Sequence, residues 1–106
     1  MRLLLVIFFL VVPAMAFAED LQYKLTIHDH RFEPAQLRVP AGKRVRLMIE
    51  NRDSSAEEFD SHALNREKVI PANFTAPVYI GPLTPGQYPF IGEFHSDSAK
   101  GVIIVE

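Results

Sequence analysis

Apolar and polar residues alternate along several short stretches of this chain, a pattern typical of β-strands that bury one face. The alternation is clearest over residues 21–28 and 44–50, where every second side chain is apolar. Turn-forming residues separate these and further stretches at intervals of roughly 8–12 residues. The expected strands are residues 21–28, 37–39, 44–50, 57–60, 75–80, 87–91 and 102–106.

Proline and glycine mark the turns between these stretches. Residues 40–43 (Pro-Ala-Gly-Lys) and 81–86 (Gly-Pro-Leu-Thr-Pro-Gly) are strong turn signals, and residues 31–34 form a third expected turn. Seven or so short strands joined in this way predict an all-β fold, a single Greek-key β-sandwich.

Three segments depart from the simple alternation. Residues 51–56 are short and polar and form an expected loop. Residues 61–73 fit neither a strand period nor a helix period, and we interpret them as a loop in which residues 63–67 could form one helical turn. Pro77 cannot donate a backbone hydrogen bond, so the strand over residues 75–80 is expected at a sheet edge or a bulge.

The N-terminus has a different character from the rest of the chain. Arg2 is followed by an apolar run over residues 3–12 and by a small-x-small ending over residues 16–18. This arrangement is typical of a cleaved secretory signal peptide, and the run is shorter than the roughly 20 residues that a membrane span requires. We expect residues 1–18 to be removed and residues 19–106 to form one exported domain that does not itself span a membrane.

Composition narrows the classes of function. The 106 residues include 13 acidic and 11 basic residues, with a net charge of −2 at pH 7 when histidine is neutral, so we expect no nucleic-acid partner. Cysteine is absent, which excludes disulfides and thiol chemistry. The sequence has no glycine-rich phosphate loop and no spacing that indicates a nucleophile and its base, so we assign no catalytic residue.

The polar loop before the last strand contains His95, the strongest candidate for chemistry. Glu93 would share a face with His95 if the preceding strand continued, and a carboxylate with an imidazole suits a first-row metal ion. We therefore treat His95 and Glu93 as candidate metal ligands, the alternative being an exposed histidine that only hydrogen-bonds its loop. The histidines at residues 28 and 30 have a spacing too common to identify a site, and we interpret them as surface residues.

Glu57 and Glu58 are further candidate ligands because they begin an expected strand. Adjacent strand residues point to opposite faces, so one of them faces the metal while the other is solvated, and the pattern leaves open which. Asp60 and His62 form a possible secondary ligand set. The alternative is that these glutamates are ordinary surface charges.

A series of turn and strand motifs runs along the whole of residues 19–106. The motifs are Phe32-Glu33-Pro34, Val39-Pro40-Ala41-Gly42, Leu47 to Asn51, Glu58-Phe59, Pro85-Gly86-x-Tyr88 and Gly101-Val102-Ile103-Ile104-Val105. In this order they resemble the cupredoxin family. The resemblance implies a cupredoxin-like β-sandwich with its functional loops at one end.

The resemblance also implies where a metal centre would lie. A type 1 copper centre in that family uses two histidines, a cysteine and usually a methionine. His95 matches the second histidine, whereas the first histidine falls near Glu57, the cysteine near Gly92 or Glu93, and the methionine near Ala99. Without a thiolate ligand a blue copper site cannot form.

A second set of motifs narrows the resemblance. They are Glu58-Phe59-x-Ser61-x-x-Leu64-Asn65-Arg66-Glu67-Lys68-Val69, Ile80-Gly81-Pro82-Leu83 and Gly92-Glu93-Phe94-His95. They resemble the small periplasmic cupredoxin-like proteins encoded with bacterial high-affinity iron permeases. This implies a periplasmic protein that binds copper or iron and assists the oxidation or hand-over of ferrous iron. The implied partner is an inner-membrane iron permease or another periplasmic metalloprotein.

Other functions stay open on the sequence alone. A ferroxidase-type component, a periplasmic copper carrier and a metal-free interaction subunit docking on a permease all fit the same fold. The discriminating observation is whether Glu57 or Glu58, Glu93 and His95 converge within coordination distance.

Overall fold

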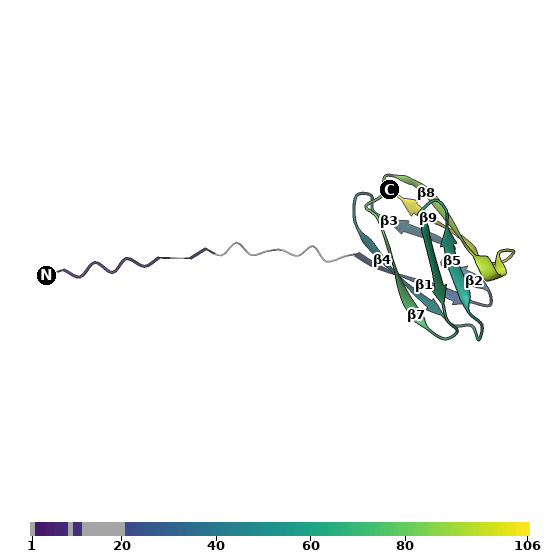
Figure 1. Ribbon diagram of the computed structural model, residues 1–106. Coiled ribbons are helices and arrows are strands. Elements are labelled where there is room, and N and C mark those ends of the chain that lie inside the picture. The colour runs from purple at the N-terminus through teal and green to yellow at the C-terminus, as the bar shows by residue number, and fades with distance from the viewer. Residues whose placement is uncertain (1, 9, 12–20) are drawn as a thin grey trace.

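The computed structural model describes residues 2–8, 10, 11 and 21–106 (Figure 1). Residues 2–8, 10 and 11 have exposed side chains and form no helix or strand. The end of the predicted signal peptide, with its cleavage position, lies outside the described residues. In the parts of the chain that are described, no helix has the length and apolar character needed to cross a membrane.

Nine strands over residues 21–106 form two sheets that pack face to face (Figure 1). The sheet orders are β2-β1-β4-β7 and β3-β9-β8-β5-β6, and the pairs β1–β4 and β3–β9 are parallel. This confirms the predicted all-β sandwich. The elements are β1 (Leu21–His28), β2 (Arg31–Glu33), β3 (Gln36–Val39), β4 (Val45–Asn51), β5 (Glu57–Ser61), β6 (Arg66–Ile70), β7 (Thr75–Ile80), β8 (Gly86–Gly92), the 3₁₀ turn η1 (Glu93–His95) and β9 (Lys100–Val105).

The loop predicted over residues 61–73 is wrong in part, because β6 lies within it and pairs antiparallel with β5. A tight turn joins the two strands, with Asn65 at a φ of 53° and its N–H donating to the His62 carbonyl. The predicted helical turn over residues 63–67 is therefore absent. Four of the five β6 residues are exposed, and a strand exposed on both faces at a sheet edge has no alternation to reveal it.

Two smaller predictions have different outcomes. Pro77 lies in β7, which is an edge strand, so the expectation of a sheet edge is confirmed. Residues 31–33 were expected to be part of a turn, but they form β2 and pair with the end of β1. The turn itself lies one step earlier, at Asp29 and His30, where φ is 52° and 55°.

Three phenylalanine rings pack against one another in the core between the two sheets. Phe32, Phe59 and Phe90 form a triangle of rings in which Phe32 meets Phe90 edge to face at 4.8 Å and Phe59 meets Phe90 at 5.1 Å. Such arrangements add to the stabilisation from burial alone. Phe59 and Phe90 lie two residues from Glu57 and Gly92, on the same buried face of β5 and β8.

Candidate functional site

Glu57 points into the sandwich. It is the first residue of β5, and the strand buries Glu57, Phe59 and Ser61 while leaving the two residues between them partly exposed. Only 1% of Glu57 is exposed. The sequence left open which of the two glutamates points inward, and the structure shows that Glu57 faces the interior and Glu58 faces outward.

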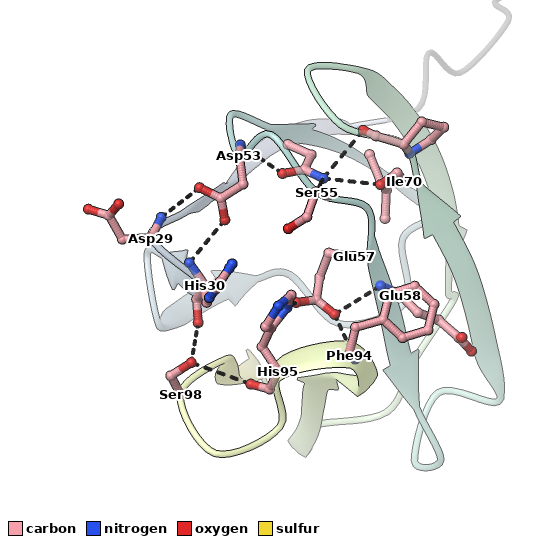
Figure 2. A network of polar contacts seen from close by, with 12 residues as sticks. Asp29, His30, Asp53, Ser55, Glu57, Glu58, Ile70, Phe94, His95 and Ser98 are labelled. Atoms are coloured by element: carbon pink, nitrogen blue, oxygen red, sulfur yellow. Dashed lines mark hydrogen bonds and ion pairs between the residues drawn. The ribbon is translucent and has the colours of Figure 1, made fainter.

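The Glu57 carboxylate is fully engaged by hydrogen bonds (Figure 2). Its Oε1 accepts the backbone N–H groups of Glu58 at 3.0 Å and Phe94 at 2.9 Å. Its Oε2 lies 2.6 Å from Nδ1 of His95. A buried carboxylate is stable only with such partners, and these bonds tie the start of β5 to η1.

Gly92 allows the carboxylate to approach this closely. A Cβ atom at this position would lie 2.6 Å from Cδ of Glu57 and 2.6 Å from Cβ of Ala99, closer than carbon atoms can pack. The four positions that the cupredoxin resemblance assigns to metal ligands therefore do converge, with His95 as the fourth. The residues present do not fit a type 1 copper centre, because the Glu57 carboxylate fills the space where a thiolate would stand.

His30 is part of the same cluster, so its interpretation as a surface residue is wrong. Its ring stacks on the His95 ring, with centroids 3.5 Å apart and an interplanar angle of 11°. The His30 backbone is held on both sides: its N–H donates to Asp53 Oδ2 at 3.0 Å, and its carbonyl accepts the Ser98 hydroxyl at 2.7 Å (Figure 2). The left-handed backbone conformation of His30 turns its side chain toward His95.

Asn51 and Asp53 build the loop that holds His30, and sequence reasoning missed both. Asn51 is 1% exposed. Its Nδ2 donates to one carbonyl within the loop and to another at the end of β6, and its Oδ1 accepts the Asp53 N–H at 3.0 Å. Burial acts to raise the pKa of Asp53, but the N–H groups of His30 and Asp29 more than offset it, and the pKa is lowered overall. The available signal was that Asn51 continues the inward-facing series of β4.

The other candidate ligands lie elsewhere. Glu93 is exposed on η1, because β8 ends at Gly92 and the chain then turns, so Glu93 does not share a face with His95. Figure 2 shows the Glu58 side chain pointing away from His95. Partial desolvation raises the pKa of Glu58, and nearby carboxylates, Glu67 foremost, raise it further.

Asp60 and His62 do not reach the cluster. Both line a shallow surface pocket beside the β5–β6 turn, together with Asn65, Arg66 and Glu67. The secondary ligand set considered from the sequence is thus separate from His95.

The cluster has suitable donors but is not arranged around an ion. Across residues 21–106 and the other described positions, no three acidic or histidine side chains are placed to hold a metal. Parallel rings 3.5 Å apart cannot both direct an in-plane lone pair at one ion about 2.0–2.1 Å away. Two imidazoles and a carboxylate do suit copper or iron, and binding at both rings would require the His30 ring to turn.

Comparisons with known proteins agree with this fold. A protein of Rickettsia prowazekii (strain Madrid E), uncharacterized protein RP394, is 45% identical over 85 residues, covering 80% of this chain and 68% of that protein. The metal-binding domain of the Streptococcus pneumoniae D39 Cu(I)-exporting P-type ATPase CopA, solved with Cu(I), superposes with a TM-score of 0.72. It is 14% identical and covers 80% of this chain and 84% of its own.

A second solved structure gives the same result. Auracyanin A, a "blue" copper protein from Chloroflexus aurantiacus, has a TM-score of 0.71 and 15% identity, and covers 83% of this chain and 100% of its own. At these identities the likeness concerns the fold alone. The family model of the cupredoxin-like domain matches residues 1–105. The chain therefore belongs to the cupredoxin-like domain family.

Proposed function

We propose that this protein is a periplasmic metal-binding protein that binds copper or iron at the cluster around His95. The observation that carries the proposal is the stack of His30 on His95, with the buried Glu57 carboxylate bonded to the same imidazole. Two imidazoles and a carboxylate meet at the loop end of a cupredoxin-like sandwich. The copper-bound state of one structural neighbour and the description of the other as a copper protein support this choice of ligand.

The residues of the cluster would have distinct roles in binding a metal ion. Imidazole nitrogen suits copper and iron, and the metal, when bound, would supply one-electron redox chemistry. Asp53 and Ser98 hold the His30 backbone, while Glu57 holds the His95 ring. Solvent has almost no access to Glu57, which is 1% exposed.

The cellular role that we propose is assistance in ferrous-iron oxidation or hand-over within an iron-transport system. Its support is the motif resemblance to cupredoxin-like proteins encoded with iron permeases, together with an N-terminal sequence typical of export. The proposed partner is an inner-membrane iron permease or another periplasmic metalloprotein.

Anaerobic titration of the exported protein, residues 19–106, with Cu²⁺ and Fe²⁺, followed by exposure to air, tests the proposal. We expect binding that is lost in His95→Ala and kept in His62→Ala, a matched histidine variant outside the cluster. Ferrous oxidation faster than in buffer would support the role in iron transport. Copper binding without iron oxidation would favour a copper carrier, and absence of binding would favour a metal-free interaction subunit.

A further inference from the structure

We propose that His95 offers its Nε2 atom to the metal ion, with Glu57 acting as a positioning residue rather than a ligand. This inference rests on the proposed metal-binding function and specifies which atoms perform it. It differs from the ligand set expected from the sequence, in which a glutamate binds the ion directly.

The first argument concerns the hydrogen bonds of Glu57. Oε1 already accepts two backbone N–H groups, and Oε2 faces Nδ1 of His95 at 2.6 Å. An ionised carboxylate only accepts hydrogen bonds, so Nδ1 carries the hydrogen. The neutral imidazole then has its free lone pair on Nε2. Metal-binding histidines commonly donate their other N–H to a carboxylate in this way, which fixes the ring and raises its basicity.

The second argument concerns access. The His95 side chain is 26% exposed, whereas that of Glu57 is 1% exposed. Gly92 and Ala99 close the space beside the carboxylate, since even a Cβ on Gly92 would collide with both neighbours. An ion arriving from solvent therefore meets the partly exposed imidazole before the buried carboxylate, and binding to Glu57 would compete with its three hydrogen bonds.

The third argument identifies His30 as the second donor. Its backbone is held by Asp53 and Ser98, yet its ring makes no hydrogen bond with the described residues and is retained only by stacking on His95. Turning this ring about the side-chain torsions, which binding at both rings requires, breaks no hydrogen bond of the His30 backbone. Two imidazoles completed by water form a site that suits Cu²⁺ better than a hard cation.

The test begins with the metal-free, unaltered protein labelled with ¹⁵N. Long-range ¹H–¹⁵N spectra at neutral pH report which ring nitrogen of His95 carries the hydrogen, and we expect Nδ1. Addition of Zn²⁺, a diamagnetic probe, should then shift the Nε2 resonances of His95 and His30. A hydrogen on Nε2 in the metal-free protein, or loss of the Nδ1 hydrogen of His95 when Zn²⁺ is added, would overturn the inference.

Cu²⁺ titration of variants supplies the second arm. Glu57→Gln should weaken binding by about 10- to 100-fold without changing the stoichiometry, which is the effect typical of losing an outer carboxylate. His95→Ala should abolish binding, and Glu58→Gln, the same change one residue away on the outer face, should leave it unaltered. Loss of binding in a folded Glu57→Gln variant as complete as in His95→Ala would make Glu57 a ligand. Absence of Cu²⁺, Fe²⁺ and Zn²⁺ binding by the unaltered protein would instead overturn the proposed function, and this inference with it.

Discussion

The two faces of β5 give neighbouring residues of similar chemistry opposite roles. On the inner face, Glu57, Phe59 and Ser61 are 1%, 0% and 2% exposed, and both polar side chains are hydrogen-bonded. On the outer face, Glu58 and Asp60 stand opposite Val69 and Glu67 of β6, in contact with solvent. The chemical identity of a glutamate is therefore less informative than the side of the strand on which it lies.

The electrostatic environments of the two faces differ in sign. Glu57 is surrounded by hydrogen-bond donors, which offset the cost of burying its carboxylate. Glu58 is surrounded by carboxylates, so its charge is opposed. Substitutions on the inner face should therefore lower the free energy of unfolding, whereas removal of the Glu58 charge should raise it.

The largest effect is expected for Glu57→Ala. The change leaves the N–H groups of Glu58 and Phe94 and Nδ1 of His95 without their acceptor, and each orphaned donor is costly in a buried position. We expect the free energy of unfolding to fall by about 3 kcal/mol, as measured by urea denaturation. Glu58→Ala is the matched control and should cause no loss. Equal losses in the two variants would remove the distinction between the faces.

Gly92→Ala should have the second largest effect. The new methyl group would collide with Glu57 and with Ala99, neither of which is free to move, and overpacking of this kind costs about 1–3 kcal/mol. Gly86→Ala, in the same strand, places its methyl group no closer than 3.6 Å to other atoms and serves as the control. Thermal unfolding of the two variants checks the prediction, and a Gly92→Ala melting temperature equal to that of Gly86→Ala would contradict it.

A smaller effect is expected for Ser61→Ala, at the other end of the inner face. The Ser61 hydroxyl donates to the Pro89 carbonyl at 2.8 Å and accepts the Leu64 N–H at 3.1 Å, which ties the β5–β6 turn to β8. Its loss should cost about 1 kcal/mol in the free energy of unfolding. Asp60→Ala, one residue away on the outer face, should not lower stability when measured by the same denaturant titration.

The smallest effect is expected for Glu58→Gln, and its sign is opposite. Because the pKa of Glu58 is raised in the folded state, its ionisation opposes folding at any pH above that raised pKa, and the penalty vanishes below the ordinary value of 4.5. Glu58→Gln should therefore raise the melting temperature slightly at pH 7 and leave it unchanged in acid. Melting curves at the two pH values test this, and a decrease at pH 7 would show that the Glu58 charge is stabilising.

The strands with clear alternation were predictable from the sequence, whereas β6 was not. In β1 and β4 one face is buried, so the sequence repeats every two residues. In β6 four of five residues face solvent, and no hydrophobic pattern results. Edge strands exposed on both sides are therefore the elements that periodicity reveals least.

The candidate site was predictable only in part. His95 follows from its polar loop, but the choice between Glu57 and Glu58 depends on strand phase, and residues 52–56 interrupt the alternation that would carry the phase from β4 to β5. His30 joins the cluster through a left-handed backbone conformation and through a contact with Ser98, 68 positions away. Neither feature leaves a local pattern in the sequence.

That long-range contact also bears on the order in which the molecule acquires its structure. Within residues 21–106, β3 pairs only with β9, which lies more than 60 positions further along, and the loop bearing His95 immediately precedes β9. Topologies dominated by such distant pairings fold slowly, because a large loop must close before the contacts that stabilise it form. A chain emerging from its N-terminus first can assemble β1, β2 and β4 early, but the His30–His95 stack must wait for η1 and β9. The stack is therefore acquired late in folding, and a molecule without η1 and β9 would lack it.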